Sequence, residues 1–475
     1  VRQILDDEGK PMEEPIQVSP GLDNETVSYF KNYTSALTAI KERGKKTDDY
    51  VISNRVDFDF EKGAEKVLAE IPEGCAQSLT FTSGIRKNNE TIGKLGNRYE
   101  VRLRPQVVTL PGTVPVKFEN IAIKFEQGEA RELNGENGKL DTEDIVFVNN
   151  GNSLTFGANV TFLKGDQDDC SAIIYGGSVD TDTFGLSPDM DLKTTKEATV
   201  QIASGTFTAV YGGGTKAQGS DGVLGTKVLA DPVNTNVIIT GGTVGKVFGG
   251  GSGENGLVKG NTLVRISGGV INAASVYAGG ENANVEGDTQ LDISSSIPTT
   301  EADAKSYYGG SQNGTVTGNT TVKLLAMNNN TDTNFYLDTV SGYGTDENGA
   351  LSENSVTGNA VVSLQQNDPK DTAFVAHIKV LSGFTDLTLG NTDRTLVGGT
   401  APVYDFEKSK VIVTERFDSE PTGNSADITT ARDGNVALYA TSLVLDGQWQ
   451  GHINNLSTTD PCALNVTKKG GAIYP

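Results

Sequence analysis

The sequence predicts an all-β fold built from stacked coils of short strands, with a capping helix near its N-terminus. Gly supplies 57 of the 475 residues, and Asn, Thr and Val are abundant, which is typical of turns and strands. A pattern of Val-x-Ile followed by glycines and an aromatic residue recurs along the middle of the chain. The recurring unit is too short to bury its own apolar side chains, so it needs neighbours above and below it.

The sequence of the first 165 residues predicts an extended arm, followed by elements that cap the end of the stacked strands. Residues 1–21 carry charges and prolines without an apolar period, and we expect a linker or extended arm. From Asn24 to Arg43 the apolar spacing is that of one helix face. This helix is interpreted as a cap over the open end of the sheet, and a partner-binding helix is the alternative. Its apolar positions are Val27, Phe30, Tyr33, Leu37 and Ile40.

Short strands follow the helix within the segment 22–165, which we interpret as the N-terminal cap and first coils. Val56, Phe58 and Phe60 alternate with charged residues and predict a strand, and residues 61–71 predict a short helix. Further strands are expected at 78–83, 99–104, 114–118, 121–125, 145–148 and 153–162.

The segment 166–390 is predicted to hold the central repeats. The aromatic marker recurs at intervals of 29 to 37 residues, at Tyr175, Tyr211, Phe248, Tyr277, Tyr308 and Tyr343. A second marker, Gly-Asn/Asp-Thr/Ala, places its polar residue at Asn261, Asp288, Asn319 and Asn359. Residues 391–475 repeat less clearly and are interpreted as closing coils and a C-terminal cap.

Stacking gives each repeated position an expected environment. Like strands would lie about 4.8 Å apart. The triplet Val200, Val237 and Val264 would then form one interior column, and Ile202, Ile239 and Ile266 another. The aromatics are expected to form a ladder in the core or at a corner, the alternative being an outward platform for sugars. The Asn/Asp positions are expected at a bend with left-handed backbone.

These repeats, with runs such as Ile-Thr-Gly-Gly-Thr-Val-Gly-Lys-Val-Phe-Gly-Gly-Gly, resemble right-handed parallel β-helix proteins of the pectin-lyase-like kind, especially bacterial surface or adhesin-like proteins. The resemblance covers about residues 171–364. It implies a right-handed single-stranded parallel β-helix, a β-solenoid, with an N-terminal capping helix. A β-propeller is the main rival, but its blades need about 40 residues and four strands.

The composition restricts the partners. The formal charge of −22, from 61 acidic and 39 basic residues, repels phosphate backbones and anionic lipids, so no nucleic acid partner is expected. No run of about 18 apolar residues occurs, and no membrane insertion is expected. The composition, with three cysteines and a first residue, Val1, that suggests a processed product, favours an extracellular or cell-surface bacterial protein.

The densest group of carboxylates is the one candidate for a metal site. Oxygen ligands from a folded-back loop could hold Ca²⁺, and a solvated turn between coils is the alternative. No other cofactor is expected. The candidate ligands are Asp166, Asp168, Asp169, Asp180 and Asp182.

No catalytic residues are assigned. The inverting hydrolases of the resembled family use short motifs of which fragments occur here, at 168–169, 265–266, 391–393 and 451–452, but in the wrong order and far apart. We therefore expect a secreted or cell-surface adhesin or presentation rod, monomeric, that binds a glycan or a host surface protein. The alternative is a carbohydrate-active enzyme, a polysaccharide lyase or glycoside hydrolase, on the same scaffold.

Overall fold

The computed structural model describes most of the chain to residue 389 and short strands beyond it. The described residues are 12–60, 62–83, 99–103, 107–125, 144–164, 167–168, 170–180, 184, 197–215, 233–325, 334–365, 375–389, 410–418, 427–430, 436–440, 443–444, 453–455, 464–468 and 473–474. From residue 388 onward only the backbone is described.

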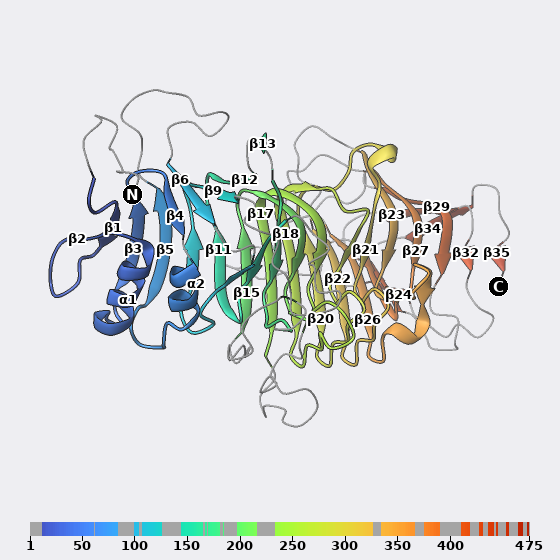
Figure 1. Ribbon diagram of the computed structural model, residues 1–475. Helices are drawn as coiled ribbons and strands as arrows, with labels where there is room; N and C mark the ends of the chain where they lie inside the picture. The colour runs from blue at the N-terminus through green and yellow to red at the C-terminus, as the bar shows by residue number, and fades with distance from the viewer. Residues whose placement is uncertain are drawn as a thin grey trace, which may run out of the picture. The chain divides into compact units, whose positions relative to one another are not determined.

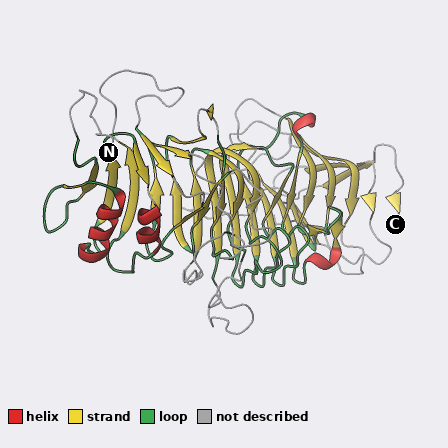
Figure 2. Ribbon diagram, in the orientation of Figure 1, coloured by secondary structure: helices red, strands yellow, loops and turns green. Residues whose placement is uncertain are grey.

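The chain divides into two compact units, Val1–Lys246 and Val247–Pro475, and each is described by itself. Strands predominate in the described residues of both units (Figure 2). The two α-helices of the described residues, α1 (Tyr33–Arg43) and α2 (Lys62–Ala69), belong to the first unit. The prediction of an all-β fold with stacked parallel strands is thereby confirmed.

Three ladders of parallel strands make up the first unit (Figure 1). The first ladder joins β3 (Asp49–Asn54), β5 (Ser78–Ser83), β8 (Val116–Phe118), β11 (Asn152–Phe156), β15 (Ala198–Ile202) and the start of β17 (Thr235–Phe248). The second joins β7 (Val107–Thr109), β10 (Ile145–Val148), β14 (Ala172–Tyr175) and β16 (Thr206–Tyr211). The third joins β4 (Phe58–Phe60), β6 (Glu100–Leu103), β9 (Ile121–Phe125) and β12 (Val160–Lys164).

Antiparallel strands close the N-terminal side of the first ladder. Strand β1 (Ile16–Ser19) pairs with β3 on one side and with β2 (Ser28–Phe30) on the other. The region expected to be a linker or arm, residues 1–21, therefore contributes a strand. The short β13 (Gln167–Asp168) pairs antiparallel with β12.

Helix α1 begins later than the apolar spacing indicated. Asn32 caps it, because its Oδ1 accepts a hydrogen bond from the Ser35 N–H at 2.8 Å and the Ser35 hydroxyl lies 3.4 Å from the Asn32 N–H. Residues 28–30, which also carried the apolar period, form β2 instead. The helix buries Tyr33, whose ring lies 5.2 Å from that of Phe60, so α1 packs on the first coil as a cap would.

Two long parallel ladders run through the second unit. One joins β18 (Thr262–Ile271), β20 (Thr289–Ile293), β22 (Thr320–Leu325), β26 (Ala360–Gln365), β28 (Asp386–Leu389), β30 (Asp427–Thr430) and β33 (Ile453–Asn455). The other starts at the end of β17 and continues through β19 (Ser275–Tyr277), β21 (Lys305–Tyr308), β23 (Asn334–Ser341), β27 (Val375–Ser382) and β29 (Lys410–Asp418). It ends in β31 (Val436–Ala440), β32 (Leu443–Val444), β34 (Leu464–Lys468) and β35 (Ile473–Tyr474).

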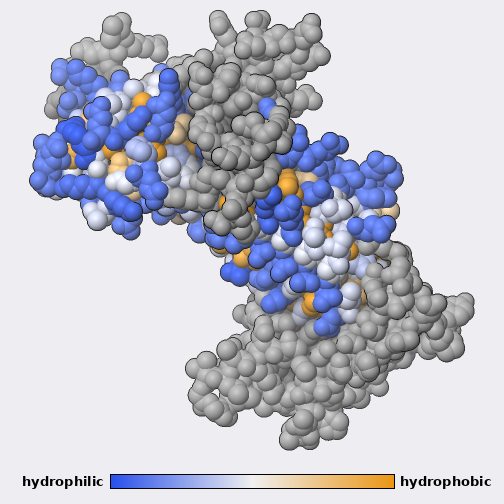
Figure 3. Space-filling view, turned by 90° about the horizontal axis from the view of Figure 1, so that it is seen from below, coloured by the Kyte–Doolittle hydropathy of each residue, from blue (hydrophilic) through white to orange (hydrophobic). Residues whose placement is uncertain are grey.

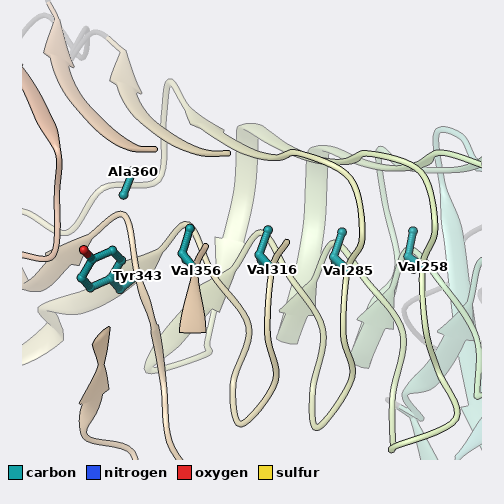
Figure 4. Packing of buried hydrophobic residues seen from close by; sticks show 6 residues of the cluster. All are labelled: Val258, Val285, Val316, Tyr343, Val356 and Ala360. Carbon is teal, nitrogen blue, oxygen red and sulfur yellow. The ribbon is translucent and has the colours of Figure 1, made fainter. Parts of the chain in front are cut away.

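A third side of the second unit is joined by single parallel bridges rather than strands. Val258, Val285, Val316 and Val356 form one such row, and all four side chains are buried. Figure 4 shows them side by side in one row, with Tyr343 and Ala360 at the end of it next to Val356. Short strands β24 (Gly344–Thr345) and β25 (Leu351–Ser352) pair beside this side. Repeated sequence positions thus become one column of core side chains.

The part of the predicted columns that lies in the first unit is confirmed. Val200 aligns with Val237, and Ile202 with Ile239, all fully or almost fully buried. The third members, Val264 and Ile266, belong to the second unit, where Val264 aligns with Leu291. The register was predictable because each strand has to place its apolar residues on the same side as the strand next to it.

Buried threonines fasten successive turns of the second unit. The Thr262 hydroxyl donates to the Ala278 carbonyl at 2.5 Å, Thr289 to Gly309 at 2.5 Å, and Thr320 to Gly342 at 2.6 Å. Each hydroxyl satisfies a carbonyl of the glycine-containing turn in the other ladder. The same stacking that aligns the strands therefore also fixes the turns.

The Asn/Asp marker forms an exposed side-chain ladder. The Asp288 N–H donates to Asn261 Oδ1 at 2.8 Å, the Asn319 N–H to Asp288 Oδ1 at 2.7 Å, and the Asn359 N–H to Asn319 Oδ1 at 2.9 Å. The expected left-handed backbone is found at other asparagines, including Asn282 (φ 53°) and Asn313 (φ 50°). At the marker positions a side chain that accepts a hydrogen bond is what the stack requires.

Candidate functional site

The predicted Ca²⁺ ligands fall mostly outside the described residues. Asp166, Asp169 and Asp182 are not among them, and of Asp168 only the backbone is described, paired with Leu163 in β13. The Asp180 N–H donates to Thr215 Oγ1 at 2.9 Å. In the described part of the chain no three His, Cys, Asp or Glu side chains converge as metal ligands would. The Ca²⁺ site stays a prediction.

The repeated aromatics do not form a surface for sugars. Tyr211, Phe248, Tyr277 and Tyr308 are each at most 6% exposed. The rings stack within each unit: Tyr175 and Tyr211 lie 5.0 Å apart with planes 5° from parallel, and Tyr277 and Tyr308 lie 4.7 Å apart at 15°. The ladder interpretation is confirmed, and these rings are unavailable to a ligand because they pack against one another.

Of the four hydrolase-like fragments, only the one at 265–266 has its side chains among the described residues. Arg265 lies with its Nη2 3.2 Å from Asp292 Oδ2, and Asp292 also accepts two hydrogen bonds from Gln290 Nε2, so the arginine serves an ion pair on the sheet. Cys75 and Cys170 are buried, and burial raises the pKa of Cys75. The fragments at 391–393 and 451–452, and Cys462, lie outside the described residues.

A different pair of rings lies on the outward side of the second unit. Tyr336 of β23 and His377 of β27 occupy facing positions in the parallel register. Their rings lie 4.7 Å apart with planes 8° from parallel. Both side chains are half-buried, unlike the repeated aromatics. Alternation explains the position, because the strand neighbours of each ring point inward and are buried.

Polar groups surround this pair, which we call the Tyr–His pair. Asn334 Oδ1 lies 3.3 Å from His377 Nε2, and Lys379 Nζ lies 3.0 Å from Asp338 Oδ1. The Tyr336 N–H donates to the carbonyl of Pro298, which anchors β23 at 2.8 Å to the turn before the 3₁₀ helix η2 (Glu301–Asp303). One amide, one carboxylate and one ammonium group therefore lie on the same sheet face as the two rings.

The electrostatic setting of His377 favours its neutral form. Burial lowers the pKa of His377, and the carboxylate of Glu301 acts in the opposite direction. A neutral imidazole stacks on a phenol ring without carrying charge into the pair, and it keeps one nitrogen as acceptor. The amide, carboxylate, ammonium and imidazole groups can accept and donate hydrogen bonds beside an apolar ring surface. This combination suits the binding of a polar ligand.

Sequence reasoning missed the Tyr–His pair although the signal was present. Residues 334–338 read Asn-Phe-Tyr-Leu-Asp and residues 375–379 read Val-Ala-His-Ile-Lys, so each has an aromatic ring between two inward apolar residues and a charge two positions later. These outward positions do not recur in the other coils. A search for repeats therefore passed over them.

In comparisons with known proteins, no family model, no curated protein and no solved structure matches the chain. Among the described residues, no helix has the length and apolar character needed to cross a membrane.

Proposed function

We propose that this protein is a secreted or cell-surface β-solenoid of the right-handed parallel β-helix kind, which acts as an adhesin or presentation rod and binds a glycan or host ligand. The general right-handedness of parallel crossovers supports the handedness. The resemblance to pectin-lyase-like surface proteins, stated from the repeats, supports the architecture. In this proposal the protein is a monomer, with α1 as its cap.

The observation that carries the binding function is the Tyr–His pair. Residues that define the repeat build the stack: its valines, threonines and rings are buried, and the exposed Asn/Asp marker forms hydrogen bonds from one coil to the next. The stacking of the coils does not require two half-buried rings, with Asn, Asp and Lys side chains nearby, on the outward side of a sheet. Figure 3 shows one face of the molecule whose described surface is mainly hydrophilic, with small scattered apolar patches. On such a hydrophilic surface, two adjacent rings that face outward indicate a site where a ligand binds.

A glycan array with the intact protein tests the proposal, paired with a screen for polysaccharide depolymerisation. We expect binding to a defined set of glycans without sugar release. Replacement of both Tyr336 and His377 by Ala should reduce binding by about fivefold to 150-fold, since stacking contacts contribute about 0.5–1.5 kcal/mol each. The matched control is Tyr29→Ala, which removes an exposed ring of the first unit. Release of sugar fragments would instead indicate a carbohydrate-active enzyme.

A further inference from the structure

One carboxylate beside the Tyr–His pair has no counter-charge among the described residues. Glu301 is exposed and belongs to η2, which lies against β23 (Figure 1). Burial lowers the pKa of His377 and the Glu301 carboxylate opposes this effect, so the carboxylate lies close enough to act on the pair. Among the described residues, none donates a hydrogen bond to the Glu301 side chain or forms an ion pair with it. A ligand at the pair would therefore meet an unbalanced negative charge.

The other carboxylates of this region each have a lysine nearby. Asp338 Oδ1 lies 3.0 Å from Lys379 Nζ. Asp303 Oδ2 accepts a hydrogen bond from the Thr300 hydroxyl at 2.5 Å, and the charge of Asp303 acts on Lys305. Two lysines thus face three carboxylates in the described part of this region, which leaves it with a net negative charge.

The strand on the other side of His377 extends the row of the Tyr–His pair. In the register, His377 of β27 aligns with Ile412 of β29, so the row consists of two rings followed by an apolar position. The basic positions of β29, Lys410 and Arg416, align with other residues of β27. A chain-like ligand could follow this row across the strands, with Glu301 at its β23 end.

We propose that the ligand of the Tyr–His pair is a glycan chain that carries protonated amino groups, and that Glu301 selects the amine over its acetylated form. This inference rests on the binding function proposed above. A sugar packs its apolar face against aromatic rings, and an ammonium group donates a charge-assisted hydrogen bond to a carboxylate. An acetamido group carries no charge and gains nothing from Glu301. The net charge of −22 also attracts a cationic chain over longer distances and repels an acidic one.

The test compares two oligosaccharides that differ only in their amino groups. Hexamers of glucosamine and of N-acetylglucosamine, with the same linkage and a fluorescein label at the reducing end, are titrated with the intact protein at a pH at which glucosamine is protonated. Fluorescence anisotropy measures both affinities. We expect the glucosamine hexamer to bind about fivefold more tightly, the upper range for an ion pair at an exposed position. Equal affinities would overturn the inference.

Two variants make the same charge change at different places. Glu301→Gln keeps the size of the side chain but not its charge, so the two affinities should become nearly equal while the acetylated hexamer binds as before. Glu347→Gln, at an exposed position of the same unit, should keep the preference for the amine. Circular dichroism checks that the variants are folded. A preference that survives in Glu301→Gln would overturn the inference, because the overall charge of the protein would then explain it.

Failure of this inference can be told apart from failure of the proposed function. Tyr336→Ala combined with His377→Ala should weaken the binding of both hexamers. If the hexamers bind equally and the double variant loses both, the pair is a glycan site that Glu301 does not make selective. If neither hexamer binds although other glycans bind through the pair, the inference is likewise wrong and the proposed function stands. Absence of binding to every glycan would contradict both.

Discussion

Single hydroxyl groups hold the turns of the second unit in place. Thr320 is fully buried and its Oγ1 donates to the Gly342 carbonyl at 2.6 Å, whereas Thr321 beside it points outward. The two residues therefore provide a matched pair for the same substitution. Valine has the shape of threonine without the hydroxyl, so the change removes one hydrogen bond and little packing.

We expect Thr320→Val to lower the free energy of unfolding by about 1–2 kcal/mol, because it leaves a buried carbonyl without this donor. Thr321→Val should change it by less than about 0.5 kcal/mol. Urea unfolding followed by circular dichroism measures both. Equal effects in the two variants would mean that the buried hydroxyls contribute nothing specific to the stack.

The coil turns are the elements that limit which side chains the stack accepts. A Cβ added at Gly279 would lie 2.8 Å from Ser311 N and 2.9 Å from Gly310 C, in the backbone of the next coil. At Gly253 a Cβ would meet nothing within 4 Å, but φ is +78°. The first position is restricted by neighbouring backbone and the second by its own conformation.

Gly279→Ala should therefore destabilise the protein by about 2–3 kcal/mol, since a backbone clash forces the coils apart. Gly253→Ala should cost about 1 kcal/mol from the left-handed conformation alone. Thermal unfolding of both variants gives the comparison. If Gly253→Ala proved the more harmful, close approach of the coils would not be the reason for the glycine at 279.

Elements also differ in how well the sequence predicts them. The alignment of Val200 with Val237 was predictable, because a repeated pattern forces equivalent residues into equivalent places. Helix α1 was predicted but not its start, because the Asn32 cap and the β2 strand divided one apolar period between two elements.

The antiparallel pairing of β1 was missed, as residues 16–19 alternate only briefly. Tyr336 and His377 were missed because they occur once each on the outward side, where stacking imposes no repeat.

At the scale of the whole molecule, the charge of −22 is the dominant electrostatic feature. Like charges repel within a folded chain, and salt screens that repulsion over roughly 8–10 Å at physiological strength. The melting temperature should consequently rise with NaCl concentration. This effect needs no bound ion, so it sets the baseline against which the predicted Ca²⁺ site has to be measured.

Calcium at matched ionic strength separates screening from binding. If the carboxylates at 166–182 converge on Ca²⁺, CaCl₂ should raise the melting temperature above the value in NaCl of the same ionic strength, and EDTA should reverse the difference. Binding to the folded state alone stabilises it by about 2.7 kcal/mol at a hundred times the dissociation constant. The double variant Asp168→Asn with Asp180→Asn should lose the calcium-specific part and keep the response to NaCl. Identical melting curves in the two salts, with no heat in calorimetry, would show that the cluster is a solvated acidic turn.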